Sequence, residues 1–233
     1  MKYKFDLHIH SLASGHAYST VTENARFAKE KGLEMIGLTD HAPKMPGGAC
    51  ELHFYNLNVL PDYIEGVRVL RGVELNILDD EGTIDLPDRI IDRLQLVIAS
   101  LHVVCITPRE ATDALVNAAK NKRVHILGHP GDPRYPFDVK AVVKAAYENN
   151  TLIEINNASF NPMNSRKGGE KTVVEILKEC RKHSYPVILG SDSHYHTNIG
   201  NFSYIEPLLA EAEMPEELII NRDSGEMLKF LGL

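Results

Sequence analysis

The histidines of this sequence lie where several of them could bind the same metal ions. His8 and His10 are separated by one residue in an apolar stretch, so both imidazoles project to the same side of an extended chain. Other histidines and carboxylates follow further apolar runs, close to the point where each run ends. The candidate metal ligands are His8, His10, His16, His41, Glu74, His102, His129, Asp192 and His194.

Nine ligands are enough for more than one metal ion. Imidazole and carboxylate groups suit zinc, manganese or iron, and a tetrahedral ion takes about four ligands. We therefore expect two to three divalent ions, with zinc favoured and with Glu74 bridging two of them. A single histidine after an apolar run is more often an ordinary core or surface group, but seven of the eleven histidines would then share this placement by coincidence.

The remaining four histidines have other interpretations. His125 lies inside an apolar run and is expected in the core, and His196 is expected in a surface loop. His183 lies at the end of a helical stretch, where a cation suits the helix dipole. His53 lies in a long irregular segment beside the candidate ligands, and we consider it a possible substrate contact.

Short apolar, branched runs alternate along the chain with amphipathic stretches of helical spacing. We expect strands at residues 3–8, 35–39, 67–74, 96–100, 124–128, 152–156 and 187–190. Helices are expected at residues 22–31, 110–121, 138–149 and 169–183, with Thr22 and Asp138 as N-caps, and two or three short helices follow residue 203. Residues 41–58, which contain two prolines and a Gly-Gly pair, are expected to form a long loop.

Strands that alternate with helices favour either a barrel or an open doubly wound sheet. No glycine-rich nucleotide-binding motif follows any of the expected strands, which argues against nucleotide-binding folds. The carboxyl ends of parallel barrel strands converge on one face, and all the candidate ligands would meet there. The length is typical of a single barrel domain, which we expect to span residues 1–233.

Composition excludes several classes of partner. The formal net charge of −7 and the pI near 5.9 disfavour binding to nucleic acid or to an anionic membrane. No apolar run is long enough for a transmembrane helix, and the first ten residues turn polar too early for a signal peptide. The three cysteines are widely spaced, as in reduced cytosolic proteins, and we expect a cytoplasmic protein.

The ordered motifs of the chain resemble those of the PHP domain, named after polymerase and histidinol phosphatase. The resemblance is carried by residues 6–10 (DLHIH), 39–41 (TDH), 72–74 (GVE), His102, 128–130 (GHP) and 190–194 (GSDSH). Residues 16–20 (HAYST), 154–157 (EINN) and 165–168 (SRKG) are more specifically similar to small stand-alone bacterial PHP phosphatases of the trinuclear zinc type. Together these motifs are highly specific and span nearly the whole chain.

The resemblance implies a distorted seven-stranded (β/α) barrel of the TIM type, with three metal positions at one end. By the pattern of the family, His8, His10, Glu74 and Asp192 would hold the first ion, and Glu74, His102 and His129 the second. His16, His41 and His194 would hold the third. Each of these positions is filled by the expected residue type.

A multi-metal site of this kind predicts a phosphatase that acts on the phosphoric monoester of a small metabolite. We expect a hydroxide that bridges two ions to be the nucleophile, because coordination lowers the pKa of water from about 15.7 towards about 7. Asp40 and Asp192 are candidates for proton transfer or for orienting the ligands. Arg166 and Lys167 are candidates for gripping the phosphate, and Asn156 could orient the substrate.

Two alternatives use the same ligands. One is a different metal hydrolase, such as a phosphodiesterase, a nuclease or an amidohydrolase; the absence of a lysine at a strand end argues against the last, and the acidic charge argues against a nuclease. The other is a metal-binding regulatory domain without catalysis, against which the complete set of ligands argues. Turnover would separate these alternatives, whereas metal analysis alone would not.

Overall fold

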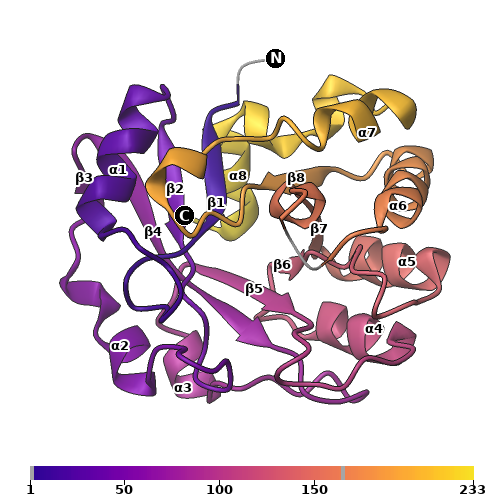
Figure 1. Ribbon diagram of the computed structural model, residues 1–233, viewed down its shortest axis with the longest axis horizontal. Helices are drawn as coiled ribbons and strands as arrows, with labels where there is room; N and C mark the ends of the chain where they lie inside the picture. The colour runs from indigo at the N-terminus through magenta and orange to yellow at the C-terminus, as the bar shows by residue number, and fades with distance from the viewer. Residues whose placement is uncertain (1–2, 164–165) are drawn as a thin grey trace.

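Seven parallel strands form a sheet that curls into a nearly closed barrel (Figure 1). The computed structural model describes residues 3–163 and 166–233. In order of pairing, the strands are β1 (Phe5–Ile9), β2 (Met35–Leu38), β4 (Val67–Asn76), β5 (Leu96–Ser100), β6 (Ile126–Gly128), β7 (Leu152–Asn156) and β8 (Val187–Gly190). Nearly all strand residues are buried, which accounts for their continuous apolar sequences. The predicted α/β fold with a seven-stranded barrel is therefore confirmed.

Helices surround the outside of the barrel (Figure 1). They are α1 (Val21–Glu30), α2 (Glu51–Tyr55), α3 (Asp88–Ile91), α4 (Thr112–Lys120), α5 (Val139–Asn149), α6 (Glu170–Lys182), α7 (Glu206–Glu211) and α8 (Ser224–Leu231). The amino end of the barrel interior is filled by apolar side chains such as Phe5 and Leu96, which pack with Met227 of α8. Because this end is packed with apolar groups, chemistry is confined to the opposite end. Within the residues described, no helix is both long and apolar enough to cross a membrane.

Local signals set the helix starts. The Thr20 hydroxyl accepts a hydrogen bond from the Glu23 amide, and the Glu23 carboxylate accepts one from the Thr20 amide. This capping box begins α1, so the N-cap is Thr20 and the predicted N-cap Thr22 is wrong. Asp138 caps α5 as predicted, because its carboxylate accepts from the Ala141 amide.

The segment predicted as one long loop contains more structure. Residues 41–58 include α2 and the start of a 3-10 helix (Leu57–Val59). A short strand, β3 (Tyr63–Ile64), then pairs antiparallel with the beginning of β4. Glu65 and Gly66, both with positive φ, form the two-residue turn between these strands. Of these elements, α2 lies near the site, with His53 beside Asp40, whereas β3 lies at the amino end of β4.

A single asparagine helps to close the barrel between its first and last strands. The segment after β8 meets the end of β1 at an isolated bridge between Ile9 and Ser193. Farther towards the amino end, the buried side chain of Asn221 accepts from the Leu189 amide at 2.7 Å and donates to the carbonyl oxygens of Leu189 and Phe5 at 2.9 and 3.2 Å. The amide group thus satisfies backbone groups that a directly paired strand would otherwise satisfy.

Candidate metal centre

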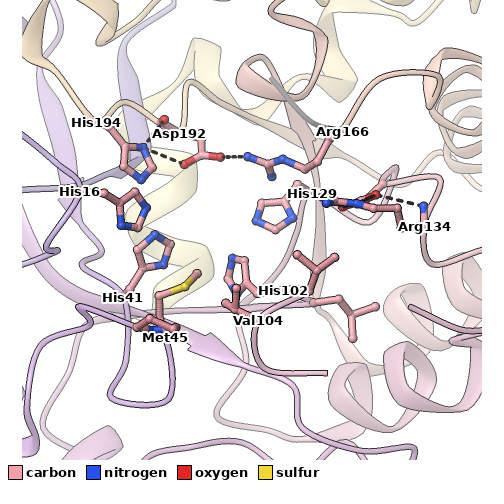
Figure 2. Close-up of a pocket in the computed structure, with 14 residues that line it drawn as sticks. His16, His41, Met45, His102, Val104, His129, Arg134, Arg166, Asp192 and His194 are labelled. Carbon is pink, nitrogen blue, oxygen red and sulfur yellow. Dashed lines mark hydrogen bonds and ion pairs between the residues drawn. The ribbon is translucent and has the colours of Figure 1, made fainter. Parts of the chain in front are cut away.

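The carboxyl ends of the strands surround a cleft of about 540 Å³. Figure 2 shows His194, His16 and His41 along one side of this cleft, with His129 and His102 facing them. The complete lining is His16, His41, Met45, Pro46, Leu101, His102, Val103, Val104, His129, Asp132, Arg134, Arg166, Asp192 and His194. Six of the nine predicted metal ligands are among these residues, and His8, His10 and Glu74 lie buried beneath them.

Glu74 is the centre of the ligand cluster. It lies near the end of β4, is fully buried, and has imidazole nitrogens around both carboxylate oxygens. The distances from Glu74 Oε1 are 3.3 Å to His8 Nε2, 3.3 Å to His102 Nε2 and 3.0 Å to His129 Nε2, and those from Oε2 are 2.6 Å to His41 Nδ1 and 3.7 Å to His10 Nε2. Burial alone would raise the pKa of Glu74, but these histidines hold the pKa well below its usual range. The carboxylate is therefore ionised, with imidazole nitrogens beside each of its two oxygens.

Asp192 supplies the second carboxylate of the cluster. Its Oδ1 lies 3.2 Å from His10 Nε2 and 3.7 Å from His8 Nε2, while its Oδ2 contacts Arg166 Nη2 at 2.5 Å. Burial would raise the pKa of Asp192, but His8 and Arg166 lower it well below its usual range. Asp192 has a φ of 53°, in the left-handed region, which turns its carboxylate towards the histidines of β1.

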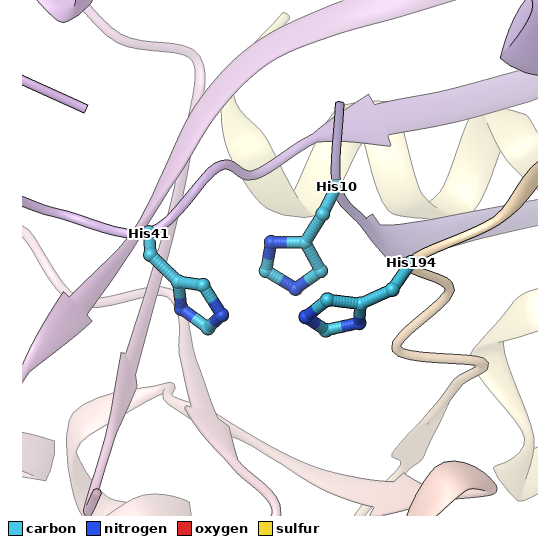
Figure 3. A group of neighbouring side chains, drawn as sticks. All are labelled: His10, His41 and His194. Carbon is cyan, nitrogen blue, oxygen red and sulfur yellow. The ribbon is translucent and has the colours of Figure 1, made fainter. Parts of the chain in front are cut away.

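Three groups of side chains have donor atoms close enough to share one ion, all within 4.8 Å of one another. The groups are His8, His10 and Glu74; His41, Glu74 and His102; and His10, His41 and His194. Figure 3 shows the last group, whose rings converge from the ends of three separate strands. In this group His10 takes the place that the family pattern assigns to His16.

His16 nevertheless lies beside the third group. Its ring stacks on those of His41 and His194, with centroid distances of 4.9 and 4.6 Å. Burial and the neighbouring His194 and His41 lower the pKa of His16 to about 4. A neutral imidazole is the form that binds a metal ion. His16 therefore has the protonation state and the location of a ligand at the mouth of the cleft.

Unpartnered buried atoms show that the cluster fits divalent cations. Buried nitrogens that the structure leaves without a hydrogen bond among the residues it describes include His8 Nε2, His10 Nε2, His41 Nε2 and His194 Nε2. Such atoms are costly in a folded protein unless they bind something. Although burial opposes it, Glu154, Glu74 and Asp192 raise the pKa of His8 well above its ordinary value, so the position favours a cation. Imidazole nitrogens around ionised carboxylates form a donor set for zinc, manganese or iron.

Outer partners fix which nitrogen of each imidazole faces the cluster. His8 Nδ1 lies 2.6 Å from Glu154 Oε1, and His102 Nδ1 lies 2.8 Å from Asn76 Oδ1. With a proton on Nδ1, each ring presents the lone pair of Nε2. Neither Asn76 nor Glu154 was a predicted site residue. Both are polar groups near the carboxyl ends of strands whose residues there are buried, and this is the signal in the sequence that could have identified them.

Four of the residues predicted for catalysis or substrate binding lie outside the lining of the cleft. Asp40 is buried and accepts from the Ser11 amide and from the Ser11 and Ser14 hydroxyls. His53, on α2, lies with its Nε2 3.6 Å from Asp40 Oδ2. Burial would raise the pKa of Asp40, but the neighbouring His53 and His10 and the hydrogen bonds from Ser11 keep it below its usual range. This arrangement orders the loop after β1.

Asn156 and Lys167 also have surroundings of their own. Asn156 is buried, its Nδ2 donates to Glu154 Oε2, and its Oδ1 accepts from the amide and hydroxyl of Ser159. Lys167 is exposed, whereas its neighbour Arg166 lines the cleft. Of the predicted motif at residues 165–168, residue 165 lies outside the described residues. The predicted role of Asp40 in proton transfer or ligand orientation remains a prediction, as do the predicted contacts of His53, Asn156 and Lys167 with substrate.

Two relatives match this chain over nearly its whole length. A probable phosphatase of Clostridium novyi (strain NT) is 50% identical over 99% of this chain and 95% of its own length. A probable phosphatase of Thermoanaerobacter sp. (strain X514) is 47% identical over 99% of this chain and 95% of its own length. Both relatives thus match the chain from end to end.

Two solved structures share the fold at low sequence identity. Histidinol phosphate phosphatase from Lactococcus lactis, in complex with zinc, L-histidinol and phosphate, superposes with a TM-score of 0.62 at 18% identity, over 91% of this chain and 95% of that one. A chain of an archaeal ribonuclease P bound to mature tRNA has a TM-score of 0.58 at 15% identity, and the match covers 98% of this chain and 90% of that one. The sequence pattern of the PHP domain matches residues 6–231. The chain therefore belongs to the PHP domain family, among relatives named probable phosphatases.

Proposed function

We propose that this protein is a phosphatase that hydrolyses phosphoric monoesters of small metabolites with the help of two to three divalent metal ions. The observation that carries the proposal is the buried ring of imidazoles around Glu74, open to a cleft that also contains Arg166. The first and second ions would be held by the ligands that the family pattern assigns. For the third, the family pattern assigns His16, His41 and His194, and the His16 ring lies against the rings of the other two.

Zinc is the metal that we propose first. The ligands are mostly imidazoles, which suit zinc, and the related fold of histidinol phosphate phosphatase was solved with zinc. When bound, such ions make a nucleophile available from water at neutral pH and neutralise charge on the phosphate. In the reaction, the oxygen of water forms a bond to phosphorus, the bond between phosphorus and the ester oxygen breaks, and a proton passes to the leaving alcohol.

Arg166 is the residue of the chain proposed to bind the phosphate. Its guanidinium is mostly buried, with 13% of its side chain exposed, and it is held at 2.5 Å from Asp192 Oδ2. An arginine in this position can donate to a phosphate oxygen while remaining paired with the carboxylate. Asp192, ionised and in contact with both Arg166 and His10, is the proposed acceptor or donor for protons. Asp40 is proposed to position the loop of Ser11 and Ser14, in line with the orienting alternative raised for it.

The cleft suits a small substrate. Its volume of about 540 Å³ lies within the usual range for metabolite and cofactor pockets. Met45, Leu101 and Val104 form an apolar side that could contact the alcohol part of the ester. Arg134 lines the rim and is held by Asp132 through contacts of 2.9 and 2.6 Å. The Arg134 guanidinium, held in place by Asp132, could donate to a polar group of the substrate distant from the phosphate.

The proposal is tested by measuring turnover and metal content on the same sample. Protein with its zinc counted is offered a panel of phosphomonoesters and phosphodiesters, and inorganic phosphate is measured. Turnover of monoesters at two to three ions per chain is the expected result. A full complement of metal with hydrolysis of diesters only would replace the monoesterase by a diesterase. No hydrolysis at full metal content would leave a metal-binding protein without this activity.

A further inference from the structure

Glu154 is a buried carboxylate that the proposed reaction does not use. It lies on β7, is 2% exposed, and points into the barrel interior among side chains such as Leu7, Ile98 and Ile188. A carboxylate in such apolar surroundings needs hydrogen-bond donors. The hydrogen-bond donors around Glu154 indicate its role.

Both oxygens of Glu154 contact candidate metal ligands. Oε1 accepts from His8 Nδ1 at 2.6 Å, and Oε2 accepts from the backbone amide of His129 at 2.8 Å. The rings of His8 and His129 lie nearly parallel, 21° apart, with their centroids separated by 5.9 Å. In the proposed centre, His8 belongs to the first ion and His129 to the second. One side chain therefore supports ligands of two different ions.

The surrounding backbone makes room for this carboxylate. A Cβ atom at Gly190 would lie 1.8 Å from Glu154 Oε1 and 3.1 Å from His8 Cβ. Any larger residue at 190 would displace the carboxylate from its contact with His8. His129, with a φ of 29°, has a backbone conformation that few residues other than glycine adopt, and the bond from its amide to Glu154 helps to hold it.

We infer that Glu154 is a positioning residue shared by two metal positions, so that the affinities of both ions depend on it. Accepting from Nδ1 of His8 leaves Nε2 to bind the first ion, and holding the amide of His129 fixes the direction in which its ring leaves the chain. This inference rests on the proposed metal centre but does not depend on phosphatase activity.

Asn76 provides a matched control, because it supports one ligand only. Its Oδ1 lies 2.8 Å from Nδ1 of His102, a ligand of the second ion. Loss of such an outer partner typically lowers metal affinity about 10- to 100-fold. Asn76→Ala should therefore weaken one zinc position, whereas Glu154→Gln should weaken two. The glutamine cannot serve both sides, since it offers one oxygen and one NH₂ group in place of two oxygens.

The experiment is a zinc titration of the full chain against a competing chelator, with the zinc retained per chain counted at each chelator concentration. Near-UV circular dichroism of the metal-free proteins shows that each variant is folded. If Glu154→Gln does not fold, Glu154→Asp is used, because it keeps the charge but withdraws the carboxylate from both histidines.

We expect the Glu154 variant to lose two ions per chain at chelator concentrations where Asn76→Ala loses one and the wild type loses none. Loss of a single ion, or an affinity equal to that of the wild type, would overturn the inference. If the Glu154 variant weakens both metal positions but the zinc-loaded wild type hydrolyses no phosphomonoester, this inference stands and the proposed function is refuted.

Discussion

Replacing Arg166 by alanine should weaken phosphate binding while leaving the metal centre filled. Because Nη2 of Arg166 already contacts Asp192, we count one charge-assisted hydrogen bond to the phosphate rather than a bidentate pair. A hydrogen bond to a charged group contributes about 1.5–3 kcal/mol. At tenfold per about 1.4 kcal/mol, kcat/KM should fall about 10- to 150-fold, mainly through a higher KM.

Metal should be retained because Asp192 keeps its other contacts. His10 Nε2 lies 3.2 Å from its Oδ1, and Asn156 Nδ2 lies 3.4 Å from its Oδ2. The assay is steady-state phosphate release from a phosphomonoester, with zinc counted on the same preparation. Lys178, exposed on α6 and outside the lining of the cleft, supplies the control, and Lys178→Ala should change kcat/KM less than about twofold because salt-screened surface charges contribute little.

Two results would refute this reasoning. Loss of zinc in proportion to activity would mean that Arg166 supports the metal ligands rather than the phosphate. An unchanged KM together with unchanged kcat would mean that the guanidinium does not contact the substrate at all.

Three further outcomes follow from the structure. His10→Ala should lose zinc and phosphate release together, because this imidazole belongs to two of the three groups of donor atoms; atomic emission and the phosphate assay check this. Asn221→Ala removes three hydrogen bonds to buried backbone groups at about 1–3 kcal/mol each, so urea denaturation should show that the free energy of unfolding falls by at least about 3 kcal/mol. A fall of less than about 1 kcal/mol would show that the junction between β1 and β8 does not need this side chain. His125 has its pKa lowered from 6.5 by burial, so the unfolded chain takes up a proton first as pH falls, and stability is lost below pH 6.5. His125→Asn keeps an acceptor for the Val97 amide and should make urea midpoints between pH 7 and 5.5 less dependent on pH; identical slopes would contradict this.

The arrangement of strands was predictable because each one is a short, branched, apolar run. The bounds of β5, β7 and β8 agree with the prediction, since both faces of these strands are buried and most of their residues are apolar. The turn at Glu65 and Gly66 was missed because β3 is only two residues long and partly exposed, so it lacks an apolar pattern. Helix α2 was missed for a similar reason: prolines and glycines precede it, and only its Phe54 is buried.

The candidate ligands were predictable because their residue types follow strand ends, whereas their partners depend on contacts far apart in sequence. Glu154 and His8 are separated by 146 residues, and the curling of the sheet, which brings β1 next to β8 and its partner β7, is what brings them together. The partners of Asn156, which looked available for substrate at a strand end, are instead close in sequence. Its partners Ser159 and Glu154 become apparent only once the chain turns sharply after β7.

The left-handed backbone conformation at His129 and Asp192 lowers the stability of the fold but places two candidate ligands. The other non-glycine residues with positive φ in the described chain, such as Glu65 and Asn150, lie in turns or at helix ends, where this conformation reverses the chain. His129 and Asp192 instead leave strands with it, at a cost of about 1–2 kcal/mol for a residue with a Cβ atom. Selection for stability alone would place glycine at both positions. The protein therefore gives up stability at the two points where its ligands must turn inwards, and a more stable variant with glycine there would be a poorer metal binder.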